Sequence, residues 1–488
     1  MIRAIVGNRT TKFECSPEEM RQLKKLFRYR KLGYYHSPKH QVWLREFRKI
    51  SAKHPTWSDE KIEDQIEVGW DGYTNLMRYG SVPTGLLLDR INSVTYLNPW
   101  NSVVSDLRQL PDHRDLTIAF QHGRPSREYQ RNAVETLVTH SGCGGILLCA
   151  TRTGKTFIAA HYLKLLKGNA CFIVDELSLM SQARDDMEPI LEEEVGEIGM
   201  GKFSPERITV ATIQTLHKHR NRVDFKKWFK SLDVLFIDEI HIAINKRNID
   251  IVKTIKPKAV FGLTATLETD KPHVYMPACA LAGPIIFRYE VKDGQADGWL
   301  SQADGYNVVF SNPMLSTGNQ QQDYKRMISA NAKRNQLVAT IADEAVKAGR
   351  RVIVLVEHVH HLQRIAHMLD CEHDCIYGER KKDERRAAMK RMDEGNLPCI
   401  LATRVFAKGV TIRTADVLID ATGFPSKNNA QQRFGRVLGQ KDGKAIYVNI
   451  YDKGNRFSAA ARSRSNAIKA LGIKVHTIKW AGKERKIF

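Results

Sequence analysis

Short apolar segments recur along this chain, separated by longer stretches with helical periodicity. One series lies between residues 118 and 285 and a second between residues 304 and 460. Segments that are apolar throughout are typical of parallel strands covered by helices on both faces. Two such series predict two tandem α/β domains, each with a parallel sheet. The expected strands are GILLCA, ACFIVD, ITVAT, VLFID and AVFGLTA, then RVIVLVE, CILAT, VLIDA and AIYVNIY.

The first 115 residues lack this alternation. They contain an expected helix, SPEEMRQLKKLFRYR, in which Ser16 is suited to cap the N-terminus and Glu19 to complete a capping box. Because domains commonly contain about 100 to 200 residues, a chain of 488 is expected to form several. The expected segments are an α+β accessory domain that binds DNA at 1–115, α/β domains at 116–290 and 291–460, and a basic tail at 461–488.

The chain carries 76 Lys and Arg against 54 Asp and Glu, which gives a formal net charge of +22. Such an excess is usual in proteins that bind a polyanion, so nucleic acid is the leading expected partner. A generally basic soluble protein has the same balance. No run of about 18 apolar residues suggests a membrane span, and the first residues do not resemble a secretory signal. We expect a cytoplasmic, intracellular protein whose eight cysteines are thiols.

A phosphate-binding loop is expected between the strand GILLCA and the helix FIAAHYLKLLK. Backbone N–H groups at the start of such a helix can hold phosphate oxygens, and Lys155 can neutralise their charge. The Thr156 hydroxyl can ligate Mg²⁺. The sequence therefore predicts an ATP site built from Thr151, Thr153, Gly154, Lys155 and Thr156.

The strand VLFID ends in two carboxylates, Asp238 and Glu239, followed by His241. Carboxylates at the carboxyl end of a parallel strand lie at the sheet edge where a phosphate loop also lies. Asp238 is expected to hold Mg²⁺, and Glu239 to orient or deprotonate the attacking water. A strand followed by an acidic turn is the alternative for this motif alone. The two motifs in this order predict ATP hydrolysis with ATP and Mg²⁺ as cofactors.

In its order of motifs the chain resembles the DExH-type helicases of superfamily 2, from about residue 124 to Tyr451. This resemblance implies two RecA-like domains. It also implies that Arg127 and Gln130 contact the adenine, that His241 belongs to the catalytic motif, and that the segment 174–182 grips nucleic acid. Further first-domain residues expected to contact nucleic acid or couple it to ATP are Thr212, Gln214, Thr264 and Thr266.

In the second domain the same resemblance implies nucleic-acid contacts at His358 and Thr403 and a nucleotide contact at Gly409. The segment from Gln432 to Arg436 resembles the arginine-finger motif, with Arg436 the first choice for the finger. Gly439 stands where such helicases often have a further arginine, so Arg433 remains an alternative finger. Thr411 stands where aspartate is frequent, and UvsW-type phage branch-migration enzymes show a similar change.

The segments 69–73 and 83–87 resemble the N-terminal domain of UvsW-like phage helicases. Trp70 is either a core aromatic beside a tight turn or a direct DNA contact. The expected function is an ATP-dependent DNA helicase or translocase that unwinds or branch-migrates forked or junction DNA in replication, recombination or repair. The alternatives are a duplex translocase or remodelling subunit without strand separation, and an RNA helicase. The expected partners are branched DNA and replication or recombination proteins, with a monomeric chain and no membrane.

Overall fold

The computed structural model describes residues 2–63, 65–97, 102–120, 126–403, 414–424, 427–441, 443–479 and 487–488. The chain divides into two compact units. The first comprises Met1–Leu148 and Thr156–Arg288, and the second comprises Cys149–Lys155 and Tyr289–Phe488. Among the described residues, no helix has the length and hydropathy that crossing a membrane requires.

The N-terminal part of the first unit is an α+β region built on a small sheet with the strand order β5-β2-β1-β6. Helix α1 begins with the expected capping box, in which Ser16 and Glu19 each accept a backbone N–H of the other. The elements are β1 (Ile2–Val6), β2 (Thr10–Glu14), α1 (Pro17–Leu26), β3 (Arg28–Arg30), η1 (Tyr34–His36), α2 (Pro38–Lys53), α3 (Asp59–Glu63), β4 (Tyr73–Asn75), β5 (Ser81–Pro83), α4 (Thr84–Leu97), β6 (Ser102–Asp106) and η2 (Leu116–Phe120).

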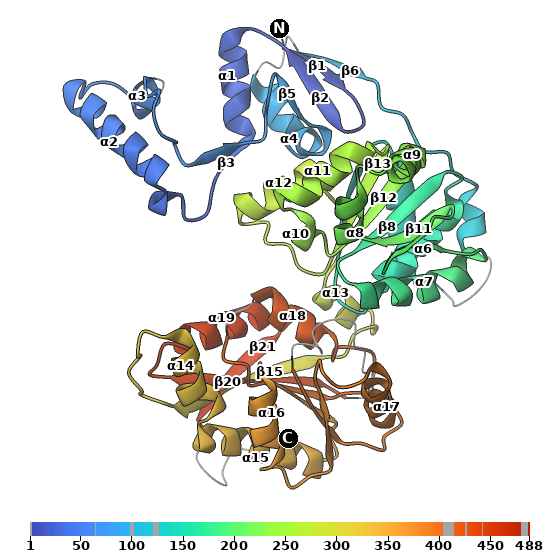
Figure 1. Ribbon diagram of the computed structural model, residues 1–488, viewed down its shortest axis with the longest axis vertical. Coiled ribbons are helices and arrows are strands. Elements are labelled where there is room, and N and C mark those ends of the chain that lie inside the picture. The colour runs from blue at the N-terminus through green and yellow to red at the C-terminus, as the bar shows by residue number, and fades with distance from the viewer. Residues whose placement is uncertain are drawn as a thin grey trace. The chain divides into compact units, whose positions relative to one another are not determined.

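This accessory sheet is fastened to the α/β part of the same unit. Asn8, in the turn after β1, donates from Nδ2 to the carbonyls of Gly142 (3.0 Å) and Lys258 (3.1 Å). Arg9 donates to the carbonyl of Cys143 at 2.9 Å. Helix α4 packs along α12 (Pro272–Ala282), as Figure 1 shows. A Cβ at Gly85 would collide with the carbonyl of Cys279, so only glycine permits this approach.

The α/β part of the first unit contains a sheet of eight described strands in the order β10-β9-β11-β8-β12-β13-β7-β14. The pairs that join β9, β11, β8, β12, β13 and β7 are parallel, so their carboxyl ends share one edge. The elements are α5 (Glu128–Thr139), β7 (Gly144–Cys149), α6 (Lys155–Leu165), β8 (Asn169–Val174), α7 (Leu177–Leu191), β9 (Gly196–Gly199), β10 (Lys202–Ser204), β11 (Ile208–Thr212), α8 (Ile213–His219), α9 (Val223–Ser231), β12 (Leu232–Asp238), α10 (Ile240–Ala243), α11 (Lys246–Ile255), β13 (Ala259–Thr264), α12 and β14 (Ile285–Tyr289).

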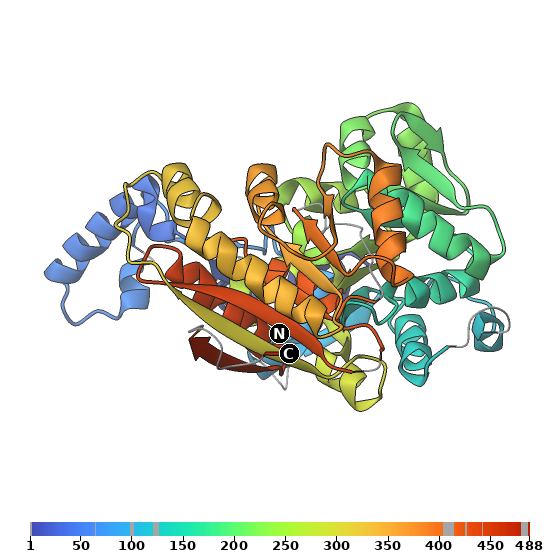
Figure 2. The same cartoon turned by 90° about the horizontal axis from the view of Figure 1, so that it is seen from below.

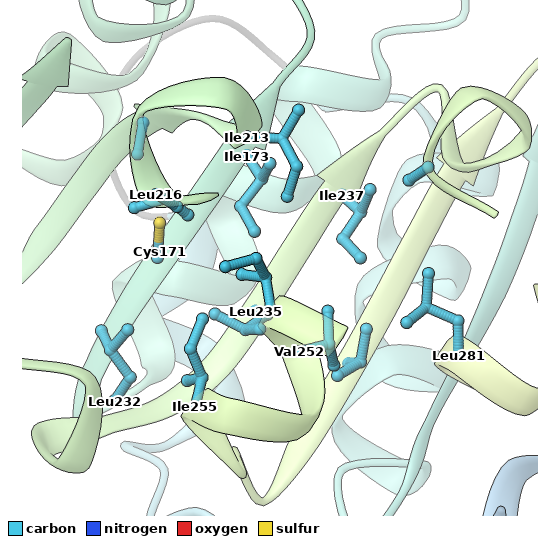
Figure 3. Close-up of a cluster of buried hydrophobic side chains, with 14 of the residues drawn as sticks. Cys171, Ile173, Ile213, Leu216, Leu232, Leu235, Ile237, Val252, Ile255 and Leu281 are labelled. Carbon is cyan, nitrogen blue, oxygen red and sulfur yellow. The ribbon is translucent and has the colours of Figure 1, made fainter. Parts of the chain in front are cut away.

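An apolar core fixes this sheet against the helices on one face. Figure 3 shows side chains of β8 and β12 interdigitating with side chains of α8, α11 and α12. Ile173, Leu235 and Ile237 come from the strands, and Val252 and Leu281 come from the helices. Each such side chain contributes about 1.5 to 3 kcal/mol when it is fully removed from water. The expected apolar strands and these helices therefore form one packed layer beneath the sheet edge at which the parallel strands end.

The second unit contains a sheet of seven described strands in the order β17-β18-β16-β19-β20-β15-β21, with parallel pairing throughout. Figure 2 shows the long strands β15 (yellow) and β20 (red) side by side. The elements are α13 (Val291–Ala296), β15 (Ala303–Ser311), α14 (Gln320–Tyr324), the π-helix η3 (Lys325–Ser329), α15 (Ala332–Lys347), β16 (Val352–Leu355), α16 (Val359–Ala366), β17 (His373–Ile376), α17 (Lys382–Asp393), β18 (Cys399–Ala402), β19 (Val417–Asp420), α18 (Lys427–Gly435), β20 (Ala445–Lys453), α19 (Ser458–Lys469) and β21 (Lys474–Lys479).

The prediction of two tandem α/β domains with parallel sheets is confirmed. The C-terminal part differs from expectation. The sequence predicts a basic tail at residues 461–488, but in the described part of this segment α19 continues past residue 460 and β21 pairs with β15 as an edge strand. The apolar residues of KVHTIK explain this difference, because Val475 and Ile478 lie on opposite faces of the strand and each packs against a core cluster, while both lysines remain exposed. The separate status of the accessory region at 1–115 stays a prediction.

A buried ion pair ties α15 to β20 in the second unit. Arg334 and Asp452 are both 0% exposed, and two N–H groups of the guanidinium donate to the carboxylate at 2.8 and 3.1 Å. We expect Arg334→Ala to lower the free energy of unfolding by about 3 to 5 kcal/mol, because it leaves a buried carboxylate without its partner. Chemical denaturation of both proteins measures this change.

The matched control for this prediction is Arg462→Ala, because Arg462 is an exposed arginine on α19. Its loss should change stability by less than about 0.5 kcal/mol. Equal stabilities of the Arg334 and Arg462 variants would contradict the assigned role of the buried pair.

Candidate active site

The phosphate-loop residues follow directly from the end of β7. The chain leaves this strand at Cys149 and enters α6 at Lys155, through a turn in which Arg152 (φ 71°) and Gly154 (φ 83°) have left-handed backbone. Thr153 is buried and donates from Oγ1 to the carbonyl of Ala150 at 2.7 Å. This bond fixes the turn that precedes the helix N-terminus. Thr151 and Thr156 are both partly exposed.

The Lys155 ammonium group donates to the carbonyl of Cys149 at 3.3 Å. A neutral carbonyl orients this cation without neutralising its charge. A positive group beside the first turn of an 11-residue helix is the environment that a phosphate ion requires. The loop residues therefore fit the triphosphate of a nucleotide.

Two neighbouring strands end beside this loop's strand at the same sheet edge. Leu148 of β7 is in register with Thr264 at the end of β13, and Leu263 of β13 is in register with Asp238 at the end of β12. The registers therefore bring the phosphate loop, Thr264 and the Asp238-Glu239 pair to neighbouring strand ends, as expected from the sequence.

Glu239, Thr264 and His241 form a hydrogen-bonded group at this edge. The Thr264 hydroxyl donates to Glu239 Oε2 at 3.2 Å, and His241 Nδ1 lies 3.0 Å from the same hydroxyl and 3.3 Å from Glu239 Oε2. Glu239 has left-handed backbone (φ 49°), which is uncommon for a residue with a side chain and is concentrated at functional sites. The structure therefore holds the Glu239 carboxylate in a fixed, partly exposed position.

Thr266 continues the motif that Thr264 begins. Its backbone N–H donates to Thr264 Oγ1 at 3.1 Å, and its own hydroxyl is buried without a hydrogen-bond partner in the described part of the chain. An unsatisfied buried hydroxyl is uncommon in folded proteins. It marks this position as a candidate for a contact with a group that binds here.

The expected nucleic-acid segments of the first unit are joined to each other. Gln214 Nε2 donates to the carbonyl of Asp175 at 2.8 Å and to its carboxylate at 3.1 Å, and this links the segment 212–215 to the segment 174–182. The Thr212 side chain is buried, and its hydroxyl oxygen lies 2.8 Å from the hydroxyl oxygen of Thr215. The two segments therefore present one surface.

The expected adenine contacts lie at the start of α5. The backbone N–H of Arg127 donates to Gln130 Oε1 at 3.0 Å, and the Arg127 guanidinium donates to the Tyr129 hydroxyl at 3.2 Å. Gln130 is 6% exposed. In this conformation its amide closes the helix N-terminus, so contact with a base would compete with that cap.

In the second unit, the arginine motif surrounds a buried carboxylate. Asp420 ends β19 and is 0% exposed, and Arg433 Nη1 lies 3.8 Å from its Oδ2. Arg464 lies 3.7 Å from the other carboxylate oxygen. Burial alone would raise the pKa of Asp420, but the two arginines and the hydrogen bonds from Thr422 together outweigh it, and the pKa lies below its ordinary value. Arg433 is therefore engaged in holding α18 to the sheet.

The remaining expected residues of this unit differ in how far their side chains are exposed to solvent. Arg436 follows the end of α18 and is partly exposed, whereas Arg433 is 6% exposed. Gln432 has a buried Nε2 without a hydrogen-bond partner among the described residues. His358 is exposed just before α16, with its ring 5.4 Å from that of His360. Thr403 is buried after β18, and Gly409 and Thr411 lie outside the described residues.

The comparisons with known proteins agree with this arrangement. Residues 124–269 match the family model of the type III restriction enzyme res subunit, and residues 332–438 match the helicase conserved C-terminal domain. The chain is 25% identical over 418 residues to the ATP-dependent DNA helicase uvsW of Enterobacteria phage T4, covering 78% of this chain and 81% of the relative. The chain belongs to the superfamily 2 helicases.

Two further comparisons place this helicase among its relatives. It is 24% identical over 377 residues to the DNA 3'-5' translocase XPB2 of Sulfurisphaera tokodaii, covering 69% of this chain and 84% of the relative. The structure of S. cerevisiae Dbp5 bound to RNA and ADP BeF3 has the same fold, with a TM-score of 0.53, 15% identity, and coverage of 75% and 92%. The two α/β domains of this helicase are RecA-like.

One residue of the helicase site is not among those expected from the sequence. Asp420 holds Arg433. It ends the apolar strand VLID, and this is the signal that also identifies Asp238. Trp70 of the accessory region donates its indole N–H to the carbonyl of Tyr73 at 2.7 Å, so its polar group serves the local turn.

Proposed function

We propose that this helicase uses ATP to unwind or branch-migrate forked or junction DNA in replication, recombination or repair. The observation that carries the proposal is the hydrogen-bonded group of Glu239, Thr264 and His241 at the ends of neighbouring strands. This group joins the carboxylate expected to act on water to the motif expected to sense the bound strand. A change in the position of Glu239 would therefore displace Thr264, to which it is hydrogen-bonded, and through Thr264 it would also displace Thr266.

The nucleotide roles follow from the loop and the strand ends. Lys155 would neutralise phosphate charge, and the loop residues Thr151, Thr153 and Gly154 would hold the phosphates through their backbone. Thr156 and Asp238 carry oxygen ligands of the kind that Mg²⁺ prefers. Bound Mg-ATP would supply the phosphoryl group that is transferred to water. Glu239 would orient the attacking water, with Arg127, Gln130 and Gly409 as the remaining nucleotide contacts.

The nucleic-acid roles are proposed for two sets of residues. The first-unit set is the surface joined by the Gln214–Asp175 bonds, together with the Thr264–Thr266 motif. The second-unit set is His358 and Thr403. Hydroxyl and amide groups suit a sugar–phosphate backbone because they bind oxygen atoms that every nucleotide presents. The net charge of +22 supports a polyanionic ligand.

DNA is favoured as the substrate by the two sequence relatives. One is named an ATP-dependent DNA helicase and the other a DNA 3'-5' translocase. The first name supports strand separation by this chain. The second supports the alternative in which this chain moves along duplex DNA, in the 3' to 5' direction, without separating the strands.

A panel of nucleic acids tests the proposal. We expect ATP turnover to be stimulated most strongly by a fork or a four-way junction, less by single-stranded DNA or linear duplex, and least by RNA. Branched DNA is favoured because the accessory region carries exposed basic side chains on α1, at Arg21, Lys24 and Lys25. Steady-state hydrolysis and strand separation are measured on each substrate at one salt concentration.

The Lys155→Ala variant is the control for this panel, because loss of its activity excludes a contaminating ATPase. Strongest stimulation by RNA would contradict the proposal. Stimulation by linear duplex with displacement of a third strand, and no separation of forked strands, would select the translocase instead.

A further inference from the structure

The tight turn before β5 presents an aromatic side chain that packing does not explain. Tyr79 is 100% exposed, so its ring contributes nothing to the core of the accessory sheet. Its backbone is left-handed (φ 49°), and so is that of the next residue, Gly80 (φ 70°). A two-residue turn with both central residues left-handed normally has Asn, Asp or Gly first. Tyrosine at this position is conformationally unfavourable and gains no compensating contact from the residues that the structure describes.

The turn itself is rigid. Arg78 and Ser81 exchange two backbone hydrogen bonds of 2.9 Å, and the backbone N–H of Phe13, a core residue, donates to the carbonyl of Gly80 at 2.8 Å. These bonds attach the turn to β2 and fix the direction in which Tyr79 leaves the surface. A rigid aromatic ring loses little conformational entropy when it stacks on another flat group.

The surroundings of the turn include exposed cations. Arg78 precedes Tyr79 and is exposed. A Cβ placed on Gly80 would lie 3.5 Å from the Met20 side chain, so the turn adjoins α1. Lys24 lies one helical turn after Met20 on the same face of α1 and is exposed. An exposed ring flanked by cations matches the combination that binds single-stranded nucleic acid, in which bases stack on aromatic rings and phosphates meet cations.

We propose that Tyr79 is a base-stacking residue, which receives an unpaired base where single-stranded and duplex DNA meet. This inference rests on the proposed function and assigns the accessory region a specific contact with the substrate. A ring stacks on any of the four bases, so the contact would detect an unpaired base without reading its identity. A continuous duplex offers no unpaired base to this ring.

Two substitutions in the full chain separate the ring from the turn. Tyr79→Asn removes the ring but introduces a residue that favours left-handed backbone, so the variant should unfold at the same temperature as the original chain or at a higher one. Tyr79→Phe keeps the ring. Fluorescence anisotropy, without nucleotide, measures the affinity of each protein for a fork, a single strand and a blunt duplex.

We expect Tyr79→Asn to bind the fork and the single strand about tenfold or more weakly, which corresponds to the loss of one stacked base. Its affinity for the blunt duplex should change less than about twofold, and Tyr79→Phe should bind all three substrates like the original chain. Unchanged fork affinity of Tyr79→Asn would overturn the proposal. An equal loss on the blunt duplex would also overturn it, because that result would indicate a backbone contact.

DNA-stimulated ATP turnover of the original chain is measured in the same experiment. If DNA does not stimulate the original chain, the proposed function fails. If DNA does stimulate it while Tyr79→Asn binds the fork normally, only the stacking role of Tyr79 fails.

Discussion

Replacing Arg436 with alanine is expected to slow ATP hydrolysis by about 10³ to 10⁵ while ATP still binds, because an arginine finger stabilises charge that develops in the transition state. Arg436 follows α18 and is partly exposed, so it can reach a ligand, whereas Arg433 is buried beside Asp420. Single-turnover hydrolysis with DNA present measures the loss. Binding of a fluorescent ATP analogue shows whether affinity is retained.

Arg433→Ala is the matched comparison in the same motif. Its expected effect is on stability, because it removes one of the two cations that compensate the buried Asp420 carboxylate. A loss of about 3 kcal/mol in the free energy of unfolding is the scale for a broken buried pair, although Arg464 remains as a second partner. If Arg433→Ala loses turnover without losing stability, and Arg436→Ala keeps its turnover, the finger is Arg433.

Glu239→Gln is expected to reduce ATP turnover by about 10² to 10⁴, which is the usual contribution of a positioned general base. The amide keeps the shape of the side chain and can still accept the hydrogen bond from the Thr264 hydroxyl. The fold and at least part of the DNA binding should therefore be preserved. Quenched hydrolysis assays measure the loss of turnover, and a melting curve for each protein measures whether the fold is preserved.

The control for this second prediction is Glu206→Gln, which makes the same chemical change at an exposed position in the same unit. It should hydrolyse ATP at the original rate. Normal turnover by folded Glu239→Gln would remove Glu239 from the site and leave the water-activating role unassigned.

The positions of the main motifs could be predicted from the sequence because the signals are local. The apolar composition of each strand indicates that it is buried. Asp238 and Thr264 are the last residues of two such strands, and the phosphate loop follows a third directly. Parallel pairing then brings strand ends to one edge without further information. The capping box of Ser16 and Glu19 was predictable for the same reason, since both partners lie within one helical turn.

The sequence by itself determined the fold class, the two α/β domains and the order of the strand-end motifs. Only the tertiary structure decided how the accessory sheet is attached through Asn8 and Gly85, which two cations Asp420 holds, and that Tyr79 is fully exposed. These features depend on contacts between residues far apart in the chain. No local pattern of charge or hydropathy encodes such a contact, because the energy of a buried pair or a close approach depends on what the folded chain places opposite it.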